Sequence, residues 1–325
     1  MRTKSESMDY INFTKELKQI VQKKMGSQYR VSIGQVLKNN GLTKDSILIK
    51  ETQSSISPNI YLEYFYERFC ECESLDEISE EIIHSYHEAI RQKTDNLENY
   101  LDFENYRKTL FFRIVHFRAN EELLKNVPHI PYLDLAITFH CVVSDESMEM
   151  QFFTVSNRMM EAWKLTVNEL YEIALDNTQQ LFPACIDTLE HIMERLLWKE
   201  QPYQSIVQNA DFESVLSNLP DHAEPQMLVM TNQYGLNGAA VILYPKLLAR
   251  VAEKLQSNLY LLPSSIHEFL VLPANGNSYP ELSKIVMDVN KHEVSKDEIL
   301  SDHVYFYNWK EHALAKVDNQ SFTPT

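Results

Sequence analysis

Glycine is scarce in this chain, and the few glycines limit where the backbone can turn tightly. Six of the 325 residues are glycine, and three of these, Gly235, Gly238 and Gly276, lie within or just beyond residues 227–272. Glycine adopts positive φ without steric cost, so these positions favour tight turns. We therefore expect the rest of the chain to be organised around residues 227–272.

That stretch alternates short apolar runs with turn residues. Runs of this length, bounded by turn signals, are typical of buried strands. Four strands are therefore predicted: Met227–Thr231, Ala239–Leu243, Asn258–Leu262 and Ile266–Leu272. Pro245 suits the first turn of a helix, and leucine and valine recur after it at helical spacing. The stretch is expected to form two hairpins joined by a helix, with residues 263–265 breaking the second hairpin.

Helical and strand periodicities both occur elsewhere in the chain. Helices are predicted over Met8–Met25, Tyr61–Phe69, Leu75–Ile90, Thr166–Asp176, Pro183–Trp198 and Pro280–Asn290. Strands are predicted over Tyr29–Leu37, Ser46–Lys50, Leu110–Phe117, Leu133–Ser144, Met150–Val155 and Val304–Trp309. Thr166 with Glu169 three residues later forms a capping box. The predicted fold class is α+β, with short mixed or antiparallel sheets and packed helices.

Two polar segments, residues 94–99 and 202–225, are candidate linkers. They divide the chain into a hairpin and acidic helical region over residues 1–98, a lobe over residues 99–200 and a lobe over residues 201–325. Residues 131–163 and 227–255 both read as strand, turn, strand and helix. This pattern suggests a repeated ββα unit in the two lobes.

The charge balance argues against non-specific binding to nucleic acid. The formal net charge is −16, and phosphate backbones are bound by neutralising them with lysine and arginine. Residues 61–108 hold 13 acidic and 5 basic residues, a net charge of −8. A solvated acidic helix face explains this best. The alternative is a surface that mimics nucleic acid.

No standard site for a metal, nucleotide or cofactor is present in the sequence. The four cysteines, Cys70, Cys72, Cys141 and Cys185, do not form a ligand pattern. The phosphate-binding and zinc-protease motifs are missing, so no cofactor and no metal are predicted. The first residues lack the apolar region of a signal peptide, and no apolar run reaches the roughly 20 residues that span a bilayer. We expect a cytoplasmic protein without a membrane partner.

Residues 263–268, PSSIHE, are the strongest local candidate for catalysis. Ser265, His267 and Glu268 supply a nucleophile, a base and a carboxylate. However, neighbouring residues of a strand point to opposite faces, and serine hydroxyls commonly stabilise turns by bonding the backbone. A structural role is therefore favoured over catalysis.

A polar pocket at one end of a sheet is the second candidate site, because loops at strand ends often bind ligands. Its expected residues, beside His267, are Asn232, Asn237, Ser264, Asp302 and His303. A hydrogen-bond network that fixes the turns is the alternative. Asp134, within an apolar run, needs a partner, for which His129 or Arg113 could serve.

Several segments resemble one known family. They are LKNNG (37–41), SPNIYLEYFYE (57–67), VPHIPYLDLAI (127–137), LPSSIHE (262–268) and LSDHVYFYNW (300–309). Together they resemble the domain of unknown function 5688 family of Firmicutes. The resemblance implies a bacterial protein and an accessory role on mobile elements, but no specific activity.

These observations favour a non-catalytic binding or regulatory module, with a protein partner ahead of a small molecule. The alternative is a hydrolase-like or metal-assisted enzyme that uses Ser265, His267 and Glu268. A third hypothesis is an acidic mimic of nucleic acid, which requires the carboxylates of residues 63–104 to line one surface.

Overall fold

The computed structural model describes residues 8–51, 58–92, 101–144, 151–198 and 227–317. The chain divides into two compact units. The first contains residues 1–38 and 42–102, and the second contains residues 39–41 and 103–325. Helices and antiparallel sheets occur in both, which confirms the predicted α+β class.

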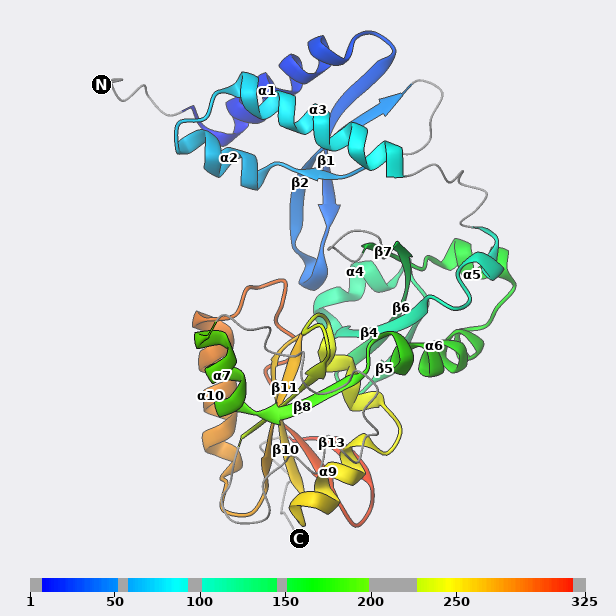
Figure 1. Cartoon of the computed structure of the whole chain (residues 1–325), viewed down its shortest axis with the longest axis vertical. Helices are drawn as coiled ribbons and strands as arrows, with labels where there is room; N and C mark the ends of the chain where they lie inside the picture. The colour runs from blue at the N-terminus through cyan, green and yellow to red at the C-terminus, as the bar shows by residue number, and fades with distance from the viewer. Residues whose placement is uncertain (1–7, 52–57, 93–100, 145–150, 199–226, 318–325) are drawn as a thin grey trace. The chain divides into compact units, whose positions relative to one another are not determined.

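The first unit is a three-stranded antiparallel sheet packed against helices. The strands are β1 (Tyr29–Leu37), β2 (Thr43–Glu51) and β3 (Ile60–Tyr61), and the helices are α1 (Tyr10–Met25), α2 (Glu63–Cys70) and α3 (Leu75–Gln92). Figure 1 shows α1 and α3 side by side against the sheet. Apolar residues at helical spacing, such as Phe13, Leu17 and Val21, are fully buried, so their burial in this core stabilises α1. The predicted helices and hairpin of this region are confirmed.

The second unit holds two antiparallel sheets. In the four-stranded sheet, β6 (Leu135–Ser144) pairs with β4 (Leu110–His116) on one side and with β5 (His129–Tyr132) and β7 (Gln151–Thr154) on the other. The six-stranded sheet has the order β13-β12-β10-β11-β9-β8. Its strands are β8 (Ala184–Thr188), β9 (Leu228–Asn232), β10 (Leu259–Ser265), β11 (Glu268–Pro273), β12 (Tyr305–Asn308) and β13 (Ala313–Lys316).

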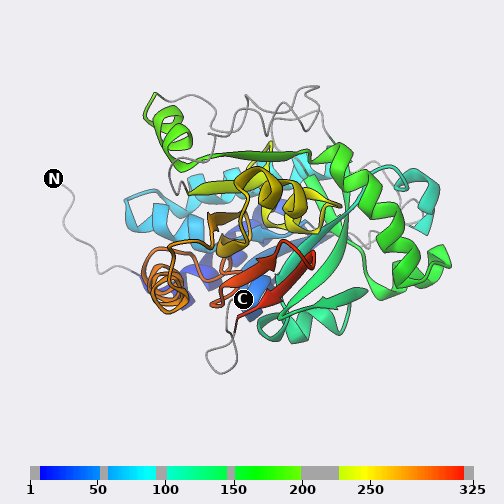
Figure 2. The same cartoon turned by 90° about the horizontal axis from the view of Figure 1, so that it is seen from below.

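Helices cover these sheets at different places. The longer elements are α5 (Asn157–Trp163), α6 (Val167–Leu181), α7 (Leu189–Leu197), the 3₁₀ helix η5 (Gly238–Leu243), α9 (Leu247–Leu255) and α10 (Tyr279–His292). Short turns of helix form η3 (Phe103–Asn105), η4 (Arg118–Asn120) and α4 (Glu121–Leu124). In Figures 1 and 2, α6 lies beside the four-stranded sheet and α10 beside the six-stranded sheet. The capping box of Thr166 and Glu169 at the start of α6 is confirmed.

The predicted pair of hairpins within residues 227–272 is wrong in its first half. Residues 239–243 belong to the 3₁₀ helix η5 instead of a strand. Short apolar runs fit a buried strand or a buried helix equally well, and η5 is buried along most of its length. The second hairpin, β10–β11, is present, but β10 continues through Ser265 with a register shift after Pro263.

Two further predictions are wrong because short apolar runs fit a strand or a helix equally well. Residues 183–198 were expected to be one helix, but Ala184–Thr188 form strand β8 before α7 begins. The repeated ββα unit is not found either. Residues 131–163 do contain β6, β7 and α5, but residues 227–255 contain one strand followed by η5 and α9. None of the helices within the described ranges is long and apolar enough to cross a membrane.

Candidate anion-binding site

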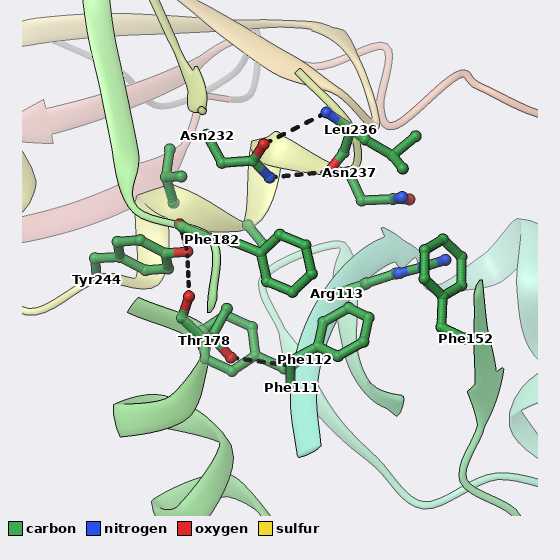
Figure 3. Close-up of a pocket in the computed structure, with 12 residues that line it drawn as sticks. Phe111, Phe112, Arg113, Phe152, Thr178, Phe182, Asn232, Leu236, Asn237 and Tyr244 are labelled. Atoms are coloured by element: carbon green, nitrogen blue, oxygen red, sulfur yellow. Dashed lines mark hydrogen bonds between the residues drawn. The ribbon is translucent and has the colours of Figure 1, made fainter. Parts of the chain in front are cut away.

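A small cavity lies in the second unit where β4, the end of α6, β9 and η5 meet (Figure 3). Its volume is about 10 Å³, which is room for roughly one water molecule. Most of its wall is aromatic or aliphatic. The lining residues are Phe111, Phe112, Arg113, Phe152, Thr178, Phe182, Asn232, Leu236, Asn237, Ala240, Val241 and Tyr244.

Arg113 is the charged residue of this wall. It lies on β4 between Phe112 and Ile114, both almost completely buried. Because side chains alternate along a strand, Arg113 and Phe111 share the other face of β4. Arg113 as a whole keeps partial contact with solvent, but its Nε and Nη2 atoms are buried.

Two aromatic rings hold the guanidinium group in place. Its central carbon is 3.7 Å from the ring centroid of Phe152 and 5.2 Å from that of Phe111. Figure 3 shows the guanidinium against the Phe152 ring. Such stacking is attractive, by about 0.5–2 kcal/mol. It orients the group but supplies no hydrogen-bond acceptor for its N–H donors.

The positive charge of Arg113 has no counter-ion in the described part of the chain. Neither Nε nor Nη2 has a hydrogen-bond partner there. Burial lowers the pKa of Arg113 to about 9, so the guanidinium is still protonated at neutral pH. Buried N–H donors of a charged group are costly without a partner, and an anion at Nε and Nη2 would remove that cost.

The neighbouring histidine does not neutralise the site. His140, on β6, lies 3.0 Å from Thr138 Oγ1 through Nε2 and 3.2 Å from Thr154 Oγ1 through Nδ1. Burial, together with the charge of Arg113, holds the pKa of His140 well below its ordinary value. The imidazole is therefore neutral, and Arg113 is the one cation among the described residues that line the cavity.

Two hydroxyl groups of the wall are already used by the backbone. Thr178 Oγ1 accepts a hydrogen bond from the backbone N–H of Phe112, at 3.1 Å. The Tyr244 hydroxyl donates to the carbonyl of Phe182, at 2.7 Å. These bonds join α6 to β4 and η5 to the end of α6, and so they fix the shape of the cavity.

Both asparagines of the predicted pocket line this cavity. The Asn232 side chain is committed to its own turn, since it donates to the Leu236 carbonyl and accepts from the Tyr234 backbone N–H. Asn237 has the left-handed φ of 53°, and Figure 3 shows its amide on the side of the Arg113–Phe152 stack. Asn237 and Arg113 therefore line the same cavity.

The residues of the PSSIHE segment do not form a nucleophile–base pair. Ser265 Oγ accepts from the backbone N–H of His267, at 3.0 Å. The Nδ1 atom of the His267 ring accepts from the backbone N–H of Asn237. Ser264 Oγ donates to Glu268 Oε1, at 3.2 Å. The serines thus bond within the turn, whereas the imidazole bonds to the residue that precedes η5.

The remaining predicted residues lie in a separate network. Asp302 accepts from the side-chain amide of Asn290, at 2.8 Å. His303 Nδ1 lies 3.0 Å from Asp134 Oδ2. The structure therefore brings Asn232 and Asn237 together with His267, whereas it places Asp302 and His303 elsewhere.

The predicted partners of Asp134 were wrong. Asp134 lies in the turn between β5 and β6, and it accepts hydrogen bonds from the hydroxyls of Tyr305 and Ser301, each at 2.7 Å. His129 instead contacts the carbonyl of Val127, and Arg113 stacks on Phe152. The true partners are about 170 residues away in the sequence, so no local pattern could reveal them.

Several carboxylates of α3 and of the loop before it are paired with cations. Arg68 contacts Glu73 at 2.6 Å and Glu81 at 2.7 Å. Lys24 of α1 contacts Asp76 at 2.7 Å and Glu80 at 3.3 Å. All four pairs lie within the first unit.

The described residues contain no group of three histidine, cysteine or acidic side chains that could hold a metal ion. All four cysteines are free; Cys141 and Cys185 are buried, and Cys70 and Cys72 are exposed.

The sequence predicts for Arg113 only a partnership with Asp134. The signal that could have found the site is an arginine within the apolar strand LFFRIVH, which has no acidic residue beside it. An inward-facing cation in such a strand requires an anion from elsewhere.

Comparisons with known proteins agree with the resemblance noted in the sequence. No curated protein and no solved structure matches the chain. The "Family of unknown function (DUF5688)" matches residues 10–309, and this range includes both units of the fold. The chain therefore belongs to the DUF5688 family.

Proposed function

We propose that this protein is a binding module without catalytic chemistry, and that it binds a small anion at Arg113. One observation carries the proposal: Nε and Nη2 of Arg113 are buried and have no acceptor among the described residues. The cavity admits one atom of about the size of a water oxygen. Chloride, which is slightly larger than a water molecule, and the small carboxylate formate carry the required charge.

The wall of the cavity supports binding over catalysis. Its hydroxyl groups, on Thr178 and Tyr244, already bond to backbone atoms. His140 is buried and neutral, so it is poorly suited to exchange protons with a bound molecule. What remains is a guanidinium held between two aromatic rings, with Asn237 in the same wall, which is an arrangement for recognition.

Thermal unfolding at constant ionic strength tests the proposal. Sodium gluconate, whose anion is too bulky for the cavity, is replaced stepwise by sodium chloride or by sodium formate. Because a ligand that binds only the folded state stabilises it, we expect the unfolding midpoint to rise, by roughly 2–4 °C for each kcal/mol of binding free energy. The chloride and formate series separate the two kinds of anion.

The matched variants are Arg113→Gln and Arg107→Gln. Arg107 is an exposed arginine of the same unit that pairs with Glu104. The rise should disappear in Arg113→Gln and persist in Arg107→Gln. An equal rise in all three proteins would contradict the proposal. So would a wild type insensitive to both anions, since a group of the chain itself would then already neutralise Arg113.

A further inference from the structure

A second, much larger cavity of the same unit is a cleft of about 580 Å³. Binding sites for small molecules typically have volumes of roughly 300–1,000 Å³. Elements α9, β12 and β13 contribute to its wall, and Figures 1 and 2 show α9 beside the β12–β13 hairpin. The lining residues are Tyr132, Ile242, Tyr244, Lys246, Leu248, Ala249, Arg250, Glu253, Tyr307, His312 and Leu314.

Three tyrosines give the cleft an aromatic wall. Tyr244 and Tyr307 are 7% and 5% exposed, so the protein holds both rings firmly. Their hydroxyls have partners, since that of Tyr244 donates to the Phe182 carbonyl and that of Tyr307 lies 3.2 Å from His312 Nδ1. Rigid rings beside leucine and isoleucine form a surface that suits a planar apolar group.

The charged residues of the cleft are two cations and one carboxylate. Lys246 and Arg250 line the cleft together with one carboxylate, that of Glu253, so cations outnumber carboxylates in its wall. The whole chain carries −16, and against that background a cationic wall favours an anionic ligand. Lys246 is exposed, and it occupies the left-handed φ of 65° directly before α9.

From the aromatic wall and these charges together, we infer that the cleft binds a planar aromatic molecule that carries an anionic group, with the ring against the tyrosines and the anion at Lys246. This site is independent of the proposed anion site, which it meets only at Tyr244. Two kinds of molecule share this chemistry: aromatic carboxylates and nucleoside monophosphates.

Equilibrium binding of matched pairs of probes tests the inference. One pair is indole-3-acetate and the neutral indole-3-ethanol; the other is adenosine 5′-monophosphate and adenosine. We expect the anionic member of one pair to bind saturably and about fivefold more tightly than its neutral partner, as expected for an exposed ion pair of about 1 kcal/mol. The pair whose anionic member binds more tightly shows whether the cleft prefers a carboxylate or a phosphate.

Variants connect the binding to the cleft. Lys246→Asn removes the charge, and asparagine tolerates a left-handed backbone; it should reduce affinity for the anionic probe to that of the neutral one. Lys164→Asn is the matched control, because Lys164 is also exposed, also left-handed with φ of 56°, and absent from the cleft. Leu314→Trp should fill the cleft and weaken the binding of both the anionic and the neutral probe.

Three results would overturn the inference. They are no saturable binding of either anionic probe at millimolar concentration, equal binding of anionic and neutral probes, or the same loss in Lys246→Asn and Lys164→Asn. Arg113→Gln should leave the affinity for these probes unchanged. This variant therefore separates failure of the cleft from failure of the proposed anion site.

Discussion

The backbone N–H of Asn237 donates a hydrogen bond to Nδ1 of His267, at 3.0 Å. A neutral ring that accepts at Nδ1 carries its proton on Nε2, and this Nε2 lies 3.5 Å from Glu298 Oε1. The carbonyl of the same histidine accepts from Thr231 Oγ1, at 2.7 Å. His267 thus ties the β10–β11 turn to β9 and to the residue that precedes η5.

This arrangement predicts that His267 stabilises the fold. Replacement by leucine leaves the Asn237 N–H without its acceptor, so the free energy of unfolding should fall by about 1–2 kcal/mol. In His267→Asn, the side-chain oxygen can take the position of Nδ1, so the free energy of unfolding should fall less than in the leucine variant. Urea unfolding of the two variants measures the difference. Equal losses would show that the Nδ1 bond contributes nothing.

Asp134 should make stability depend on acid pH. Burial alone would raise its pKa, but the hydrogen bonds from Tyr305 and Ser301 and the charge of His303 outweigh burial and lower it below the ordinary 3.8. A carboxyl with a lowered pKa stabilises the folded state at pH above its unfolded value, and this stability is lost as pH falls through the folded value. Asp134→Asn should therefore destabilise the protein at pH 7, with a difference from wild type that shrinks below about pH 4.

Two further variants check the role of Asp134. Tyr305→Phe removes a hydrogen bond to a charged acceptor and should cost about 1.5–3 kcal/mol. Asp288→Asn removes an exposed carboxylate, 79% accessible, and should change the free energy of unfolding little. Chemical unfolding from pH 3 to pH 7 gives all these values. A constant difference between wild type and Asp134→Asn across that range would rule out the lowered pKa.

Gly238 should tolerate no larger residue. A Cβ atom there would overlap Thr231 Oγ1 and lie 2.6 Å from both Asn232 N and His267 O, so two of the three contacts are with backbone atoms. Gly238→Ala should therefore destabilise the protein by roughly 3 kcal/mol or more. Gly276→Ala is the control: its Cβ meets no atom within 4 Å, but φ is +83°, so only about 1–2 kcal/mol of backbone strain is expected. Equal midpoints of thermal unfolding for the two variants would contradict this.

The sequence predicted elements well where the deciding interactions are local. The capping box of Thr166 and Glu169 starts α6 as expected, because both partners lie within one turn. Residues 239–243 were assigned wrongly because an apolar pentapeptide carries no decisive period. Gly238, the first residue of this 3₁₀ helix, also lies close to the His267 carbonyl, a contact across 29 residues that no local pattern reveals.

The residues of the candidate site also fall into those that a local sequence signal predicts and those that it does not. Asn232 and Asn237 could be named from sequence, since turn residues after an apolar strand are a local signal. Arg113 and Phe152 could not be paired, because they come from β4 and β7, which are not hydrogen-bonded neighbours in the sheet. Pairing of both strands with β6 brings them together.

Tyr244 lines both cavities, so its variants can separate the two proposed sites. Tyr244→Phe keeps the ring but leaves the buried Phe182 carbonyl without the bond it accepts at 2.7 Å, at a cost of about 1–3 kcal/mol. The Phe182 ring packs on Phe111, with centroids 4.8 Å apart, and Phe111 lies against the Arg113 guanidinium. Loss of the hydroxyl should therefore reduce the anion-dependent rise of the unfolding midpoint.

The cleft should respond differently, because it uses the ring of Tyr244 and not its hydroxyl. Binding of the anionic aromatic probe to Tyr244→Phe should stay within about twofold of wild type, less than 0.5 kcal/mol. Tyr244→Leu removes the ring as well and should impair both responses. Midpoints of thermal unfolding in chloride or formate report the first site, and equilibrium binding reports the second. If Tyr244→Phe abolished probe binding while sparing the anion response, the roles assigned to the hydroxyl and the ring would be reversed.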